Sequence, residues 1–160
     1  MKRDLVKTVL TNPVYLTACG FGAGLAPKAP GTVGTAVAIP IAVAMSWLAP
    51  SVQWAVLAAM FALGCWICQV VAQSLEDSDP AVIVWDEIVG FCVAMMLIPM
   101  SPMTVVAGFV IFRTLDILKP WPISWVEKKT PGGFGIMIDD VIAGLACNVG
   151  LQVLIHFGYL

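Results

Sequence analysis

The sequence contains little charge: Asp, Glu, Lys and Arg make up 11% of its 160 residues, and hydrophobic residues make up 60%. Soluble domains carry about 25% charged residues. So few charged side chains cannot cover a water-facing surface of this size, and we therefore expect lipid to cover much of it. The net charge of −2 is not accompanied by a dense basic patch, so we expect no nucleic-acid partner.

Several catalytic signatures are also missing. His156 is the only histidine and lies in an apolar C-terminal run, which excludes a phosphatase that uses two histidines. No cysteine is followed by arginine six positions later, so the loop of cysteine phosphatases is absent. Cys65 and Cys68 form a lone CxxC pair without the second pair of a zinc site. We interpret these two cysteines as packing residues.

Four uncharged stretches are long enough to involve a bilayer. About 20 apolar residues cross a typical hydrocarbon core, and Val52–Ala72 meets that length best. The four stretches are Val33–Ala49, Val52–Ala72, Ile88–Phe112 and Val141–Leu160.

The third stretch contains Pro99 and Pro102, which break a helix near its middle. We predict two shorter helices there, Trp85–Ile98 and Thr104–Leu118. At 1.5 Å per residue each reaches about 21 Å, which is short of a full crossing. We therefore expect a hairpin that enters the bilayer and returns Arg113 to the side where the first helix begins.

Basic residues precede the first apolar stretch and cluster again before the last one, and such residues mark cytoplasmic segments. We expect the N-terminus, the acidic segment Glu76–Asp79 and both ends of the hairpin to face the cytoplasm. The predicted fold is all-α, a single domain over residues 1–160. It is a compact polytopic membrane bundle with a proline-broken hairpin and its polar motifs on the cytoplasmic side. The basic residues are Lys2, Arg3, Lys7, Lys28, Arg113, Lys119, Lys128 and Lys129.

Five acids lie at the edges of apolar helices, where a carboxylate is costly unless it is paired, metal-bound or functional. A single acid at a helix start is explained by the helix dipole, but two adjacent pairs make that explanation weaker. Oxygen ligands without histidine or thiolate favour Mg²⁺. We expect one acid of each pair to bind the metal while the other supports it. The candidate ligands and catalytic residues are Asp86, Glu87, Asp116, Asp139 and Asp140.

The remaining acids of the chain interior lie in polar loops, and we predict that they are solvated. They are Glu76, Asp77, Asp79 and Glu127.

Arg113, Asp116 and Lys119 are spaced three residues apart on one predicted helix. Two interpretations remain open for them. Arg113 and Asp116 can form a structural ion pair, since such pairs are common at this spacing. Alternatively, Arg113 and Lys119 hold phosphate oxygens while Asp116 helps to hold the metal.

A glycine-rich segment, Gly20–Thr35, precedes the first apolar stretch and matches neither GxxxxGK[ST] nor GxGxxG. Its backbone N–H groups, together with Lys28, Thr32 and Thr35, are candidates for binding a phosphate at the next helix N-terminus. Glycines that allow close helix packing are an equally good explanation.

These motifs together resemble the phosphatidylglycerophosphatase A family, from about Asn12 to Gly144. The resemblance implies a Mg²⁺-dependent phosphomonoesterase at the bacterial inner membrane. It would convert phosphatidylglycerol phosphate to phosphatidylglycerol and phosphate in phospholipid synthesis. Ala26 and Thr35 stand where many relatives are expected to have serine. The segments that carry the resemblance are Gly20–Pro27, Pro30–Gly34, Ile83–Gly90, Phe112–Pro122 and Gly133–Gly144.

Two other classes of protein are compatible with this composition. A small membrane transporter would present polar residues through the depth of the bilayer, whereas here they collect on one side. A non-catalytic membrane subunit would need neither Mg²⁺ nor both acidic pairs. For the enzyme, we expect water activated by a carboxylate to attack, with direct attack by an aspartate as the alternative. No feature of the sequence indicates an oligomeric state.

Overall fold

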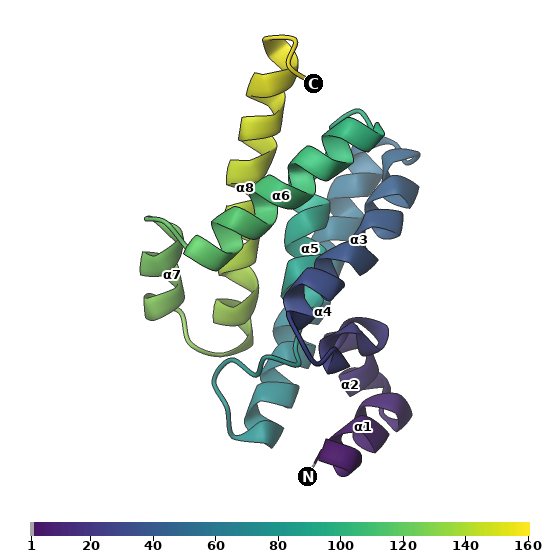
Figure 1. Ribbon diagram of the computed structural model, residues 1–160. Helices are drawn as coiled ribbons and strands as arrows, with labels where there is room; N and C mark the ends of the chain where they lie inside the picture. Colours follow the sequence, from purple (N-terminus) through teal and green to yellow (C-terminus); the bar gives the residue numbers. More distant parts are fainter. Residues whose placement is uncertain (1) are drawn as a thin grey trace.

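A computed structural model describes the backbone of residues 2–160 and the side chains from Leu5 onward (Figure 1). Within this range there is no β-strand, so the all-α prediction is confirmed. The side chains of Lys2 and Arg3, counted above among the basic residues, lie outside the described part. The elements are α1 (Lys2–Thr11), α2 (Pro13–Ala18), the 3₁₀ helix η1 (Gly20–Leu25), α3 (Pro30–Ser46), α4 (Pro50–Leu75), α5 (Trp85–Ala94), α6 (Pro102–Leu118), α7 (Ile123–Lys129) and α8 (Gly132–His156).

Prolines define where several of these helices begin. A proline stands at the start of α2, α3, α4 and α6. Proline suits this position because its missing N–H would have no helical partner there and its φ already fits a helix. In α6, Ser101 and Thr104 add a capping box, in which each side chain accepts a hydrogen bond from the other residue's backbone N–H.

The central helix is α5, which is buried at every position from Ile88 to Ala94. Helices α3, α4, α6 and α8 pack around it, and α8 makes the most extensive contact. The two backbones touch at glycines: a Cβ on Gly144 would lie 2.3 Å from the carbonyl oxygen of Gly90. Gly90 follows Asp86 by one helical turn and Gly144 follows Asp140 by one turn, so the crossing places these two acids side by side.

The proline-broken hairpin is present, but its first helix is shorter than predicted. Helix α5 ends at Ala94 rather than Ile98, and Leu97 has a left-handed φ of 58°. The reason lies on α8, where the side-chain amide of Asn148 donates to the carbonyls of Ala94 (2.9 Å) and Met96 (2.8 Å). These hydrogen bonds satisfy carbonyls near the helix end that have no helical partner.

Two helices have the length and composition of a membrane span: α4, with a mean hydropathy of 2.1, and α8, with 1.6. Helix α3 is apolar but shorter. Most of the predicted stretch Val141–Leu160 lies in a helix that starts earlier, at Gly132 before the second acidic pair, and ends at His156. Helices α4 and α8 pack against each other.

The cysteines have the packing role predicted for Cys65 and Cys68. All five are free thiols, and all except Cys65 are buried. Cys68 lies 3.9 Å from the sulfur of Met137 on α8, in the contact between α4 and α8.

Candidate active site

The polar residues of α5, α6 and α8 meet in a pocket of about 200 Å³. All five acids proposed from the sequence line it, and Lys119 lines it with them. The remaining lining residues come from the start of α3, from the loop before α5 and from Ile136. The full lining is Pro30, Gly31, Asp79, Pro80, Ala81, Ile83, Asp86, Glu87, Asp116, Lys119, Ile136, Asp139 and Asp140.

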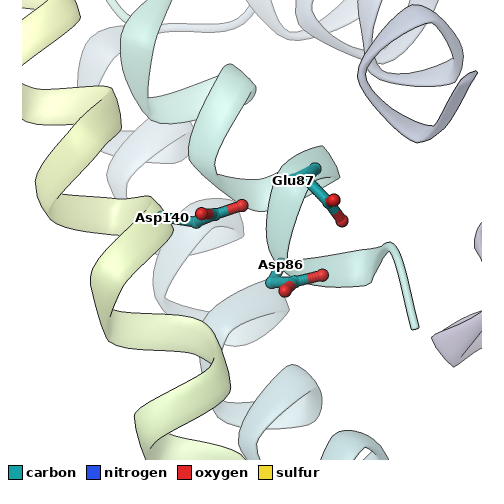
Figure 2. Close-up of side chains that lie close together, drawn as sticks. All are labelled: Asp86, Glu87 and Asp140. Carbon is teal, nitrogen blue, oxygen red and sulfur yellow. The ribbon is translucent and has the colours of Figure 1, made fainter. Parts of the chain in front are cut away.

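Three of the acids form a tight cluster, shown in Figure 2. Asp86, Glu87 and Asp140 each offer a carboxylate oxygen, and these oxygens lie within 4.8 Å of one another. The Asp140 carboxylate reaches from α8 toward the first turn of α5, where the other two residues lie. We call these three residues the acidic cluster.

The acidic cluster has the properties of a cation site. One oxygen of each member, Asp86 Oδ1, Glu87 Oε2 and Asp140 Oδ2, is buried without a hydrogen-bond partner among the described residues. Buried polar atoms are normally paired, and three adjacent carboxylates repel one another unless a positive charge lies among them. A set made only of carboxylate oxygens suits a hard divalent cation such as Mg²⁺. The residues therefore fit the metal that the sequence predicts.

The other two acids face cations instead of the cluster. Asp116 accepts a short hydrogen bond from Arg113, which also lies 3.6 Å from Glu87. The predicted structural ion pair therefore exists, and it borders the pocket. The contact with Glu87 also confirms that the hairpin returns Arg113 to the side where α5 begins. The Nε of Arg113 is buried and has no partner in the described part of the chain.

Lys119 connects α6 to α8 and α7. Its ammonium donates hydrogen bonds to Asp139 (2.7 Å) and to Glu127 (2.6 Å). The backbone of Lys119 is left-handed, with a φ of 42°. Burial alone would lower the pKa of Lys119, but its hydrogen bonds to the two carboxylates outweigh burial and raise it. Lys119 therefore stays charged next to the acidic cluster.

The side chains of the two acidic pairs are thus arranged differently from each other. We expected one metal-binding acid from each pair. On α5 both acids belong to the cluster, whereas on α8 only Asp140 does, because Asp139 turns toward Lys119.

Two further acids are exposed, as we predicted for loop acids, and they also belong to this region. Asp79 lines the pocket, and its pKa is raised because part of its side chain is shielded from water. Glu127 binds Lys119. In the sequence, the only signals were the Asp79-Pro80 step shortly before Asp86 and the prolines that turn the chain back after Lys119. Glu76 and Asp77 are exposed, as predicted.

The glycine-rich segment contributes backbone rather than side chains. A Cβ on Gly31 would lie 2.0 Å from Glu87 Oε1 and 3.1 Å from an Arg113 nitrogen, so a larger residue there would displace the Glu87 side chain. The structure does not bring Lys28, Thr32 or Thr35 to the described lining of the pocket. Thr35 is buried one turn further along α3 and donates its hydroxyl to the Gly31 carbonyl (2.9 Å), while Lys28 is exposed.

The fold and the pocket define a helical, membrane-compatible protein with an acidic pocket flanked by arginine and lysine. The sequence pattern of the phosphatidylglycerophosphatase A family matches residues 16–155, and the chain belongs to this family.

Two relatives support this assignment. The chain is 42% identical to phosphatidylglycerophosphatase A of Escherichia coli (strain K12) over 146 residues, 89% of this chain and 85% of the relative. It is also 42% identical to phosphatidylglycerophosphatase A of Haemophilus influenzae over 143 residues, 88% of each chain. No solved structure matches the chain.

Proposed function

We propose that this chain is a Mg²⁺-dependent phosphatase that hydrolyses phosphatidylglycerol phosphate to phosphatidylglycerol and inorganic phosphate. It would act in phospholipid biosynthesis at the bacterial inner membrane. Family membership and the names of the two relatives support the substrate. The acidic cluster supports the Mg²⁺-dependent chemistry, because a bound cation would pair with its three buried oxygens, which otherwise have no partner among the described residues.

Asp86, Glu87 and Asp140 would hold Mg²⁺. When bound, the metal supplies positive charge that offsets the charge on a phosphate monoester as its ester bond breaks. Asp116 and Asp139 would orient Arg113 and Lys119 through the ion pairs described above. We therefore place Asp116 and Asp139 beside the metal ligands and not in the acidic cluster.

Arg113 and Lys119 would hold the phosphate of the substrate. Arg113 presents a planar set of donors suited to two phosphate oxygens at once, and its Nε is free to join them. Lys119 lines the same pocket as a point charge. A carboxylate of the pocket would then take a proton from the attacking water.

We further propose a multi-pass topology in which the pocket faces the cytoplasm. Leu48 between α3 and α4 and Pro99 between α5 and α6 line one shared surface pocket, so these two connections lie together. In Figure 1 they lie at the upper right, away from the start of α5 and α8. The polar site thus lies toward the end opposite the hairpin tip, as expected if the tip points into the bilayer and the site faces the basic side.

Phosphate release by the purified protein tests the proposal. Phosphatidylglycerol phosphate in detergent micelles should release phosphate only when Mg²⁺ is present, and chelation should stop the reaction. Phosphatidic acid and lysophosphatidic acid should compete poorly if the glycerol phosphate head is recognised. Absence of release at any Mg²⁺ concentration from folded protein would contradict the proposal and favour a transporter or a non-catalytic subunit.

A further inference from the structure

A second cavity lies next to the acidic pocket and has the opposite chemistry. It is a surface groove of about 530 Å³, within the range of about 300–1,000 Å³ typical of ligand sites. Apart from the indole N–H of Trp121, its side chains offer no hydrogen-bonding group. The groove is lined by Leu115, Pro120, Trp121, Pro122, Ile123, Ile142, Leu145, Ala146 and Val149.

The groove begins where the acidic pocket ends. Leu115 directly precedes Asp116, and Pro120 directly follows Lys119. On α8, Ile142 lies three residues after Asp139 and therefore on the same side of the helix. The polar member of each of these three pairs lines the acidic pocket, and the apolar member lines the groove.

The groove also has a direction. It follows α8 from Ile142 to Val149, two helical turns or roughly 10 Å, away from the acidic cluster and toward the C-terminus. Helix α8 has the length and composition of a membrane span. If α8 crosses the bilayer, the groove runs from the polar site toward the hydrocarbon region, in the orientation that a bilayer lipid adopts.

We infer that this groove holds an acyl chain of the lipid substrate while its phosphate lies in the acidic pocket. This inference rests on the proposed function. A groove whose side chains offer only the indole N–H of Trp121 suits hydrocarbon better than a peptide, because most of the buried polar groups of a peptide would remain unpaired there. The groove thereby positions the phosphate, because a chain held along α8 fixes the distance of the headgroup from Lys119.

The test compares two substrates that share a headgroup, dioleoyl and dihexanoyl phosphatidylglycerol phosphate. Ala146→Phe fills the middle of the groove. The matched control is Ala59→Phe on α4, another exposed alanine on a helix of membrane-spanning length, which lines no described pocket. Val149→Trp fills the far end at a position that is 62% exposed, so it places little demand on folding.

Ala146→Phe should lower kcat/KM for the dioleoyl lipid by about tenfold or more and leave the dihexanoyl value unchanged. This follows because a displacement of about 1 Å at a reacting centre can cost 10²-fold. Val149→Trp should act in the same direction, and Ala59→Phe should change neither value.

Two results would overturn the inference. Both groove variants could leave both kcat/KM values at the wild-type level, or they could lower the two values by the same factor. A failure of the proposed function looks different: the wild-type protein itself would release phosphate from neither lipid.

Discussion

The two acidic pairs have the same local sequence pattern but different surroundings. Each follows an apolar segment and precedes a glycine that allows α5 and α8 to touch. Asp86 and Glu87 both join the acidic cluster, whereas Asp139 pairs with Lys119 and leaves only Asp140 there. The difference arises because Lys119, at the C-terminal end of α6, pairs with Asp139 and draws it away from the cluster. Similar motifs therefore acquire different partners from tertiary contacts.

The largest expected effect comes from removing charge inside the cluster. Asp86→Asn and Asp140→Asn keep side-chain shape, and each should lower kcat by roughly 100-fold or more, because a metal supplies several kcal/mol of transition-state stabilisation. Asp139→Asn should cost less, since its partner is Lys119. Steady-state kinetics on folded protein checks this order. Equal losses in the two α8 variants, Asp139→Asn and Asp140→Asn, would remove the distinction between the acids of that pair.

The second prediction concerns Arg113 on α6, which contacts Asp116 and one member of the acidic cluster, Glu87. Arg113→Lys retains the charge but loses the planar donors that contact Asp116 and, as we propose, the phosphate. We expect kcat/KM to fall by about 10- to 100-fold, as a lost hydrogen bond to a charged group costs about 1.5–3 kcal/mol. Wild-type kcat/KM in this variant would leave Arg113 with the structural ion pair alone.

The glycine contact that brings the pairs together can be broken directly. A Cβ on Gly144 would meet the Gly90 carbonyl, so Gly144→Ala should destabilise the fold by about 1–3 kcal/mol. Gly150→Ala on the same helix is the control. Its added Cβ meets nothing within 4 Å, and alanine should stabilise the helix by up to about 1 kcal/mol. Denaturation midpoints check both variants, and equal midpoints would contradict a tight crossing.

The smallest expected effect concerns the outer partner of Lys119. The Glu127 side chain is 40% exposed, and exposed ion pairs contribute about 0–1 kcal/mol. Glu127→Gln should therefore leave the unfolding midpoint and kcat/KM nearly unchanged, while Asp139 continues to hold Lys119. A loss as large as that of Asp139→Asn would show that both carboxylates are needed to position this lysine.

Much of the fold followed from local sequence, because uncharged runs and prolines act within a few residues. The segments predicted to start at Val33, Val52 and Thr104 correspond to α3, α4 and α6, each of which begins two or three residues earlier, at a proline. The break between α5 and α6 lies in the segment predicted from its prolines. The early end of α5 did not follow, because Asn148 on a distant part of the chain determines it.

The candidate site shows the same division. The five acids and Lys119 were identifiable because charge at the edge of an apolar helix is conspicuous, and all six line one pocket. Asp79 and Glu127 are exposed as predicted, but their place at the site was not predicted, because an exposed loop acid looks the same in sequence whether or not it borders a pocket. Thr35 was included among the phosphate-binding candidates because its position in the sequence does not reveal that its hydroxyl donates to the Gly31 carbonyl of the same helix.

The central claim is that α5 and α8 jointly hold one cation, and Mg²⁺ binding measured without substrate tests it most directly. Titration calorimetry on detergent-purified protein should show that Asp86→Asn and Asp140→Asn each weaken binding at least about tenfold, equivalent to about 1.4 kcal/mol. Asp139→Asn should bind Mg²⁺ nearly as the wild type does. Equal affinity in the wild type and all three variants would contradict the claim.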